Sequence, residues 1–394
     1  MIEVHRPRTC CLVLHVRKAT DAPEQAWRGH EHQPSRAWNP CVRHARDTST
    51  CIRAPLGNAE TGPAHLSCQS VSQLRLNLLT GRWVTIVPDR AKRTTDFAPR
   101  ATQVESDPNL PCPFCPGAKD PDPSITEVLD GSGEWQMRVV TNRYPAFVGD
   151  ETLSVHNMGP VHVMAEASGT HEVFVFTRDH DNRLERFSDD VIRQMMITLR
   201  DRFVAHAKTP HIRYTQAIVN HGREAGASLA HPHGQLLGLP FVPGEILEEE
   251  RAFERFKGGC IVCTTNEAEA SSERLVLKNE HAMVICPFWS SSPYELLIMP
   301  TTHNQHITGS SDDELAGVGI AIRDALRKVV DTIGDIAFNL VFHTAPAHHS
   351  GQYHWHAHLF PKLTTTAGFE RGTGVMINII APESAAAELR KSAK

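Results

Sequence analysis

The chain has 394 residues, of which 40% are hydrophobic and 22% charged, and a formal net charge of -5. This length allows one to three domains with real cores, and the net negative charge argues against broad nucleic-acid binding, which needs a basic surface. No apolar run approaches the roughly 20 residues of a membrane helix, and the short stretch at 10–16 lacks a convincing cleavage site. No signal peptide or membrane association is therefore predicted, and two CxxC pairs favour metal or redox chemistry in the cytoplasm.

Residues 1–72 differ in composition from the rest of the chain. They are rich in Arg, His, Cys and Pro, and they sustain neither a period of 2 nor one of 3.6. We interpret them as a disordered extension or as the product of a start codon placed too early. The alternative is a metal-binding arm rich in His and Cys. The segment is left out of the predicted fold.

From Gln73 onward the pattern becomes regular. A helix is predicted to begin after Ser188, which is an N-cap residue followed by two acidic residues, and to continue through VIRQMMITLRDRFVAHA. Alternation and turn residues predict strands in the same part of the chain at 79–88, 137–142, 171–176, 215–220 and 231–242.

The second half of the chain repeats the plan of the first. CIVC (260–263) corresponds to CPFC (112–115), and the predicted strand 294–300 corresponds to the strand 171–176. A second Ser-Asp-Asp, at 311–313, begins another amphipathic helix. His180 and His231 are separated by 51 residues, as are His303 and His354. Equal intervals of this kind are typical of an internal repeat.

The repeat predicts an α+β protein of two homologous halves, each an antiparallel sheet with flanking helices. The first half, residues 73–245, would be catalytic and carry a zinc site. The second half, residues 246–394, would carry the second metal site or sites.

The CxxC pairs and the regularly spaced histidines predict two zinc sites. Structural zinc takes four Cys or His ligands in a tetrahedron. The alternative is a redox CxxC, but such pairs usually open a helix in a thioredoxin-like unit, and neither pair is expected to do so. The predicted ligand sets are Cys112, Cys115, His180 and His231 in the first half, and Cys260, Cys263, His303 and His354 in the second.

A third cluster remains in the second half. His343, His356 and His358 lie on neighbouring segments, and Glu249 is a further candidate. Alternation along a strand places His354 on the same face as His356 and His358. A carboxylate with three imidazoles binds zinc or iron. Ordinary polar contacts are the alternative.

The segment HPHGQ supplies a candidate nucleophile. If His231 points to zinc, alternation places His233 on the same face, where its metal-bound neighbour can orient it. A neutral imidazole attacks phosphorus without losing a proton first. Gln235 can donate to a phosphoryl oxygen but cannot take a proton as a third His would. This favours transfer to an acceptor over hydrolysis.

Three further residues are candidates for binding phosphate. Ser228 follows two small residues that permit close backbone approach. Arg90 and Arg93 can hold diphosphate oxygens in bidentate fashion, although a solvated basic loop is the alternative reading.

The segment NHGREAGASLAHPHGQ (220–235) resembles the active-site signature of the galactose-1-phosphate uridylyltransferases, a branch of the histidine-triad superfamily. RLNLLTGRWVTIVPDRAKR (75–93), TNRYPAF, TRDH and HWHAHLFP are also similar to segments of that family. The resemblance extends from about Gln73 to Arg390.

This resemblance implies a ping-pong reaction. UDP-glucose would uridylylate His233 and release glucose 1-phosphate, and galactose 1-phosphate would then accept the uridylyl group. It also implies a homodimer, zinc ligation by the set built on Cys112 and Cys115, and a second metal site at Glu249 and its three histidines. It makes Arg90, Arg93, Ser228 and Gln235 phosphate contacts, Asn142 and Asn220 nucleotide contacts, and Glu370 a hexose contact.

Other functions stay open at this stage. CIVC and GFERGTG (368–374) also resemble relatives that act on ADP-glucose, so an ADP-sugar phosphorylase or adenylyltransferase with the same nucleophile is the main alternative. A non-catalytic nucleotide-binding protein would not need the intact HPHGQ. A histidine-triad hydrolase is disfavoured by Gln235.

Overall fold

The computed structural model describes residues 71–88, 111–118 and 122–392. The predictions for the N-terminal extension, apart from its last two residues, lie outside the described residues. The same holds for Arg90 and Arg93. All that follows concerns the described ranges.

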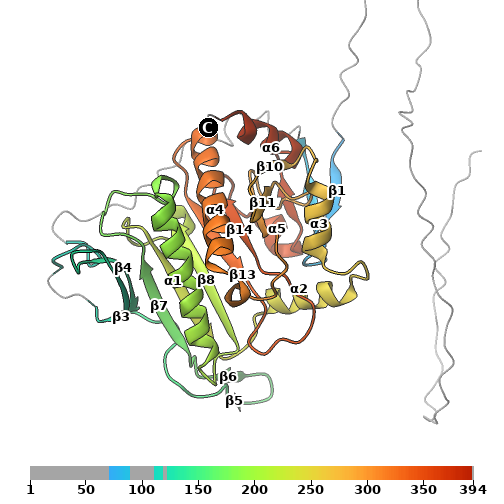
Figure 1. Ribbon diagram of the computed structural model, residues 1–394. Coiled ribbons are helices and arrows are strands. Elements are labelled where there is room, and N and C mark those ends of the chain that lie inside the picture. The colour runs from blue at the N-terminus through green and yellow to red at the C-terminus, as the bar shows by residue number, and fades with distance from the viewer. Residues whose placement is uncertain (1–70, 89–110, 119–121, 393–394) are drawn as a thin grey trace, which may run out of the picture. The chain divides into compact units, whose positions relative to one another are not determined.

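A ten-stranded antiparallel sheet forms the centre of the fold (Figure 1). This confirms the predicted α+β class with antiparallel pairing. In sheet order the strands are β10 (Leu275–Lys278), β11 (Ala282–Ile285), β12 (Leu296–Pro300), β14 (His356–Pro361), β13 (Phe338–His343), β8 (Tyr214–His221), β9 (His233–Leu239), β7 (Thr170–Val175), β4 (Trp135–Thr141) and β3 (Ser124–Leu129).

The strand order is the same when read inward from either end of the sheet. β3, β4, β7, β9 and β8 follow one another from one edge, and β10, β11, β12, β14 and β13 from the other. The two sets meet at β8 and β13, where Asn220 lies opposite Asn339. The sequence suggested a separate sheet in each half. Instead the sets share one sheet, because each covers an edge strand that the other would leave unpaired. The homology of the halves and the boundary at residue 245 stay predictions.

Two long helices lie side by side on one face of this sheet (Figure 1): α1 (Asp189–Ala207) and α4 (Asp312–Ile333). Ser188 Oγ accepts the N–H of Val191, and Ser311 forms a capping box with Glu314. Each cap satisfies backbone donors that the first helical turn leaves free. The N-terminus predicted for the first helix is thereby confirmed.

Ion pairs between the two helices follow an antiparallel arrangement. Arg200 of α1 contacts Asp312 at the start of α4 at 2.5 Å, and Arg323 of α4 contacts Asp189 at the start of α1. Acidic residues at helix N-termini also interact favourably with the helix dipole. The apolar sides of both helices pack with β-strand residues of both halves in one core, which includes Phe174, Leu236, Leu296 and Leu340 among its members.

The opposite face of the sheet is covered differently in its two parts. Over the second half lie α2 (Gly244–Arg255) and α3 (Ile261–Glu269), whose Phe253 and Ile261 share a core with Leu297 of β12. Over the first half, the loop 111–118 inserts Phe114 against Val173 and Val175. This face carries His233 and Gln235, because Leu236, the next residue after Gln235 on β9, points into the helix-covered core on the other face.

Three local predictions were wrong. Cys260 is the N-cap of α3, so the second CxxC does open a helix. The sequence offered no Ser, Thr, Asp or Asn cap there, and burial of Ile261 and Val262 stabilises the short helix instead. His231 was expected within a strand, but β9 begins at His233, since Pro232 has no N–H for the ladder.

His354 was likewise expected within a strand, and β14 begins only at His356. The N–H of the intervening Trp355 donates to the carbonyl of Asn304 at 3.0 Å instead of joining the sheet.

A small second sheet joins the first two described strands to a strand near the C-terminus. β1 (Gln73–Leu76), β2 (Trp83–Ile86) and β15 (Met376–Asn378) form a small sheet in which β15 and β2 are parallel. Arg75 donates to Glu383 of α6 (Pro382–Lys391) at 2.9 Å.

The remaining elements are the hairpin β5 (Val155–Asn157) and β6 (Val163–Ala165), α5 (Gly368–Thr373), and the 3-10 turns η2 (Leu184–Arg186), η3 (Arg223–Ala225) and η4 (Ile307–Gly309).

The described helices include none that is both long and apolar enough to cross a membrane.

Gly319 of α4 allows the close approach of the two long helices, and this generates a stability prediction. A Cβ at this position would lie 2.6 Å from Ile192 Cγ2 and 2.6 Å from Met196 Cγ. Gly319→Ala should therefore lower the free energy of unfolding by about 1–3 kcal/mol through overpacking, despite the roughly 1 kcal/mol gain in helix propensity. Urea unfolding measures the change. The matched control is Gly244→Ala, where a Cβ meets nothing within 4 Å, and it should be neutral. Equal stability of both variants would contradict the packing argument.

Candidate active site and metal centres

The structure brings the four predicted ligands of the first zinc site together. Their ligand atoms all lie within 4.8 Å of one another. Cys115 Sγ is 3.4 Å from His180 Nδ1 and 3.6 Å from His231 Nδ1, and Cys112 Sγ is 3.8 Å from His231 Nδ1. Tetrahedral zinc, with bonds of about 2.3 Å to sulfur and about 2.0 Å to nitrogen, spaces such ligands about 3.5 Å apart.

The chemistry of this donor set also fits a bound cation. Burial and the neighbouring Cys112 raise the pKa of Cys115 to about 11, so the Cys115 thiolate forms readily only beside a compensating cation. His231 Nε2 donates to the carbonyl of Thr177 at 2.7 Å, which leaves Nδ1 free as a ligand. A ligand imidazole held by a backbone carbonyl is typical of protein metal sites.

The second predicted set converges in the same way. Cys263 Sγ lies 3.4 Å from both His303 Nδ1 and His354 Nδ1, and Cys260 Sγ lies 3.5 Å from His354 Nδ1. Burial and Cys260 raise the pKa of Cys263 to about 12, which again requires a cation for the thiolates. Although this CxxC opens α3, its thiols face two imidazoles. That arrangement fits a metal site better than a redox pair.

The third predicted group also assembles, beneath α2. His343 Nδ1 is 2.8 Å from Glu249 Oε1, and His356 Nε2 is 3.8 Å from the same oxygen. Burial alone would raise the pKa of Glu249, but His343 and His356 hold it well below its usual range. Among the described residues, His356 Nε2 is buried beside Glu249 without a hydrogen-bond partner, whereas His358 Nδ1 lies 3.9 Å from another carboxylate, that of Glu295. A carboxylate and three imidazoles whose ligand atoms lie within 4.8 Å of one another fit a zinc or iron ion.

His233 stands next to the first Cys/His group. Its Nδ1 donates to the carbonyl of His231 at 2.7 Å, so in the neutral ring Nε2 carries the lone pair. Burial lowers the pKa of His233, and only the His231 carbonyl opposes the shift. The ring of Phe114, from the loop between the two cysteines, packs at a centroid distance of 5.3 Å. The imidazole is thus neutral, oriented and held from two sides.

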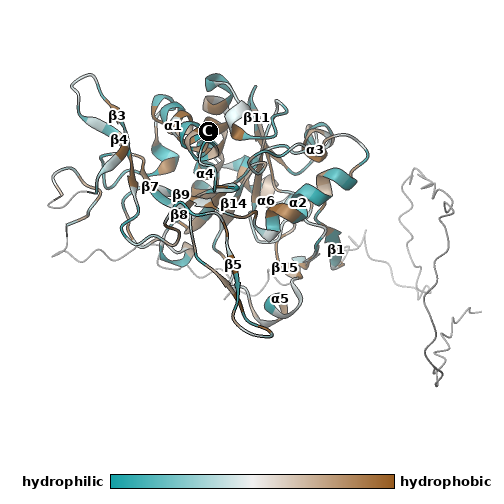
Figure 2. Cartoon of the chain, turned by 90° about the horizontal axis from the view of Figure 1, so that it is seen from below, coloured by the Kyte–Doolittle hydropathy of each residue, from teal (hydrophilic) through white to brown (hydrophobic). Residues whose placement is uncertain are grey.

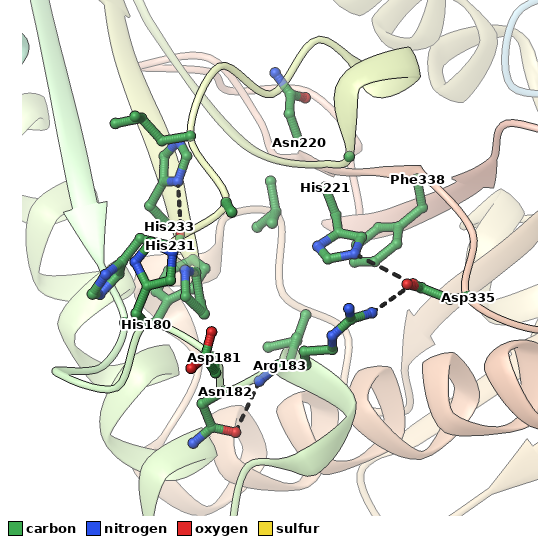
Figure 3. A pocket seen from close by; sticks show the side chains of 17 residues that line it. His180, Asp181, Asn182, Arg183, Asn220, His221, His231, His233, Asp335 and Phe338 are labelled. Carbon is green, nitrogen blue, oxygen red and sulfur yellow. Dashed lines mark hydrogen bonds and ion pairs between the residues drawn. The ribbon is translucent and has the colours of Figure 1, made fainter. Parts of the chain in front are cut away.

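A cavity of about 470 Å³ opens beside these histidines. Figure 3 shows His231 and His233 on one side of it and Arg183, His221 and Asp335 on the other. Arg183 is 2.6 Å from Asp335, and the ring of His221 is stacked on Phe338. The predicted residue Asn220 also lines the cavity. A space of this volume accommodates a small organic ligand.

The side chains of Gln235 and Asn142 both lie beside His171, a residue that was not predicted from the sequence. His171 Nε2 is 2.8 Å from Gln235 Oε1 and 3.2 Å from Asn142 Nδ2. His171 is buried on β7, opposite Leu237 of β9. Alternation in HEVFVF places His171 on the face of Val173 and Val175, and this signal could have identified it.

Asn220 has a partner from the second half of the chain, which was also missed. Asn339 Nδ2 donates to Asn220 Oδ1 at 2.7 Å and to the carbonyl of Ala225 at 2.9 Å. The amide of Asn339 therefore holds both Asn220 and the loop that follows it. Asn339 lies four residues before His343, so strand alternation from that histidine places both on one face.

Two predicted contacts are not brought to His233 by the structure. Ser228 is exposed on the loop before β9. Glu370 is half-buried in α5, where its carboxylate accepts the N–H of Ala367 at 3.1 Å. Neither residue is among those that line the cavity. Their roles stay predictions.

Comparisons with known proteins agree with this geometry. Residues 64–243 match the model of the galactose-1-phosphate uridyl transferase N-terminal domain, and residues 187–392 match a domain of unknown function. An ADP-glucose phosphorylase of Arabidopsis thaliana is 30% identical over 329 residues, covering 81% of this chain and 92% of the relative. A galactose-1-phosphate uridylyltransferase of Thermotoga maritima is 30% identical over 336 residues, covering 81% and 98%.

Solved structures of two such enzymes are similar in fold to this chain. The Arabidopsis thaliana ADP-glucose phosphorylase with bound ADP-glucose has a TM-score of 0.71 at 28% identity and covers 82% of this chain and all of its own. A uridylyltransferase structure has a TM-score of 0.63 at 25% identity and covers 81% and 97%. These relatives are nucleotide-sugar enzymes. The chain belongs to the galactose-1-phosphate uridylyltransferase family.

The contact between Phe114 and His233 generates a prediction for the first Cys/His group. Cys112→Ser should remove one bound metal ion and lower the melting temperature, because the 111–118 loop loses its anchor. Metal content by mass spectrometry and thermal unfolding measure both effects. Cys260→Ser, the matched control at the second group, should also lose one ion but leave the loop that packs on His233 in place. A folded Cys112→Ser protein with the full metal content would contradict the ligand assignment.

Proposed function

We propose that this protein is a galactose-1-phosphate uridylyltransferase, which converts UDP-glucose and galactose 1-phosphate to glucose 1-phosphate and UDP-galactose. The observation that carries the proposal is the Nδ1–H of His233 bound to the His231 carbonyl at 2.7 Å, which leaves Nε2 as a neutral nucleophile. The family membership of the chain and the assembled Cys/His groups support it.

The reaction proceeds in two displacements at phosphorus. His233 Nε2 forms a bond to the α-phosphorus of UDP-glucose, and the bond from that phosphorus to the bridging oxygen breaks, so glucose 1-phosphate leaves. A phosphate oxygen of galactose 1-phosphate then attacks the same phosphorus. The P–N bond breaks, its electron pair returns to Nε2, and UDP-galactose is released. No net proton transfer to the histidine is needed.

The protein's own groups favour the charge that develops in this reaction. When Nε2 bonds to phosphorus, the imidazole becomes cationic, and its Nδ1–H bond to the His231 carbonyl becomes charge-assisted and stronger. Burial keeps the free ring neutral and available for attack. We assign Gln235 and Ser228 as phosphoryl contacts and Asn142 and Asn220 as nucleotide contacts. Glu370 is assigned to the hexose, and Arg90 and Arg93 to the diphosphate.

Metal ions have a supporting role in this proposal. Cys112, Cys115, His180 and His231 would hold zinc, as would the set built on Cys260 and Cys263. A zinc ion bound there supplies a rigid cross-link between loops and orients the His231 main chain. Glu249 and its three histidines would hold zinc or iron.

An ADP-sugar phosphorylase acting through the same His233 is the second candidate. Two observations favour it. The Arabidopsis thaliana ADP-glucose phosphorylase has a higher TM-score than the uridylyltransferase structure quoted above. The second Cys/His group is the other observation: its four ligand atoms lie within 4.8 Å of one another. Its CxxC pair resembles that of relatives that act on ADP-glucose.

We further infer a cytoplasmic homodimer. The described cysteines are all unpaired thiols, as expected in a reducing compartment. The β5–β6 hairpin exposes apolar side chains, with Val155 58%, Met158 62%, Val161 78% and Val163 64% accessible. Figure 2 shows hydrophobic residues, in brown, along this hairpin. A single hairpin is marginally stable in water, and an exposed apolar patch is typical of an interface. We assign this hairpin to the contact with a second copy.

The dimer can be tested with a charge in this hairpin. Val163→Glu should shift the protein from dimer to monomer in size-exclusion chromatography with light scattering, because a buried, unpaired carboxylate is costly. The control is Glu127→Gln on the exposed β3 edge, which should leave the dimer intact. A Val163→Glu protein that stays dimeric would place the interface elsewhere.

The covalent intermediate gives the direct test of function. Intact-mass spectrometry after incubation with UDP-glucose, without acceptor, should show one uridylyl adduct that maps to His233. His233→Ala should abolish the adduct and reduce transfer by about 10⁶-fold, as loss of a catalytic nucleophile does, while metal content and melting temperature stay unchanged.

A parallel incubation with ADP-glucose separates the two candidates. An adenylyl adduct alone would assign the protein as the ADP-sugar enzyme. Absence of an adduct from either donor, with a folded and metal-bound protein, would overturn both. His221→Ala is the control for a nearby histidine, since this ring lines the same cavity and would still permit the adduct.

A further inference from the structure

His171 has no assigned role, yet it is the residue through which the Gln235 side chain is held. It is 9% exposed and lies on the same face of the sheet as His233 and Gln235. Three polar groups surround its imidazole: the backbone N–H of Ala146, the Gln235 amide and the Asn142 amide. Its carbonyl also accepts the N–H of Asn142 at 2.8 Å.

The contact with Ala146 determines the protonation state of the ring. A backbone N–H can only donate, and the N–H of Ala146 is 3.0 Å from His171 Nδ1. Nδ1 must therefore be the acceptor, and in the neutral ring the proton is on Nε2. This tautomer follows from a main-chain donor and does not depend on how any side-chain amide is oriented.

The tautomer in turn determines the orientation of Gln235. Because Nε2–H is a donor, the Gln235 atom 2.8 Å away must be the carbonyl oxygen, as the structure has it. The amide NH₂ of Gln235 consequently points away from His171. It has no hydrogen-bond partner within the described ranges, so it is available to a ligand on the face that carries His233.

We propose that His171 is a positioning residue that presents the Gln235 amide as a hydrogen-bond donor to the phosphoryl group bound at His233. The inference rests on the proposed function and adds the residue that orients its phosphate contact. Without His171 the amide can rotate and offer its oxygen, which repels a phosphoryl oxygen. A preorganised donor is worth more to a transition state than one that must reorient.

The contact between His171 and Asn142 fits the same arrangement. In the Nε2–H tautomer both His171 Nε2 and Asn142 Nδ2 carry protons, so their 3.2 Å approach is not a hydrogen bond. The Asn142 Oδ1 accepts the N–H of Tyr144 at 2.9 Å, and no residue that the structure describes accepts a hydrogen bond from the Asn142 NH₂ group. His171 thus stands between two amides that both offer donors.

A double-mutant cycle tests this role. The readout is the first-order rate of nucleotidyl-protein formation at saturating donor, for His171→Phe, Gln235→Ala and the double variant. His171→Phe keeps the ring volume and should slow the step about 10- to 100-fold, as misplacement of a contact group does. If His171 acts through Gln235, the double variant should be no slower than Gln235→Ala alone. His171→Gln, which retains an N–H donor, should recover part of the rate.

A matched control separates positioning from general stability. His206 is a buried histidine that bonds Thr215 on the other face of the sheet. His206→Gln should leave the rate of the step unchanged in both the wild-type and the Gln235→Ala backgrounds. Independent, multiplying losses for His171→Phe and Gln235→Ala would overturn the proposal.

A second measurement does not require activity. In protein labelled with ¹⁵N-histidine, the signals lost in His171→Phe identify this ring, and their shifts should report a proton on Nε2. A proton on Nδ1 would overturn the proposal even in an active enzyme. If the wild-type protein forms no adduct with either nucleotide sugar, the proposed function fails, while the tautomer still decides the orientation of Gln235.

Discussion

The hydrogen bond from His233 Nδ1 to the carbonyl of His231 is the interaction on which the site depends. His231 makes three contacts with different parts of the chain: its Nδ1 faces the cysteines, its Nε2 donates to Thr177, and its carbonyl holds the nucleophile. Any group that holds the His231 ring therefore also positions the His233 ring. The candidate metal group and the proposed nucleophile are thus joined at one residue.

The second half of the chain contains the same local arrangement without the same chemistry. His356 Nδ1 donates to the carbonyl of His354 at 2.9 Å, as His233 does to His231. His356, however, is fully buried, and its Nε2 faces Glu249 beneath α2. On the corresponding face of the first half, the part of the chain that the structure describes contributes the loop 111–118 and no helix. His233 of the first half therefore lines a cavity, while His356 of the second half is enclosed with other histidines around a carboxylate.

The joined sheet explains why the two sets of strands are not independent. β8 and β13 pair along the centre, and Asn339 of β13 donates both to Asn220 and to the loop that leads to β9. The second half thus contributes directly to the geometry of the first. The ion pairs between α1 and α4 reinforce this association on the other face.

The sequence by itself determined what local patterns and residue chemistry can encode. The Ser-Asp-Asp cap located α1, and the CxxC pairs with the regularly spaced histidines predicted the two Cys/His groups that the structure brings together. HPHGQ pointed to His233 as the candidate nucleophile. The tertiary structure alone decided the single sheet, the helix at Cys260, and the pairing of Gln235 with His171 and of Asn220 with Asn339. Each of these depends on groups distant in the chain, whose hydrogen bonds and burial are established only when strands and helices pack. Spacing within a segment can place His171 or Asn339 on one face of its strand, but it does not say which side chain lies beside it.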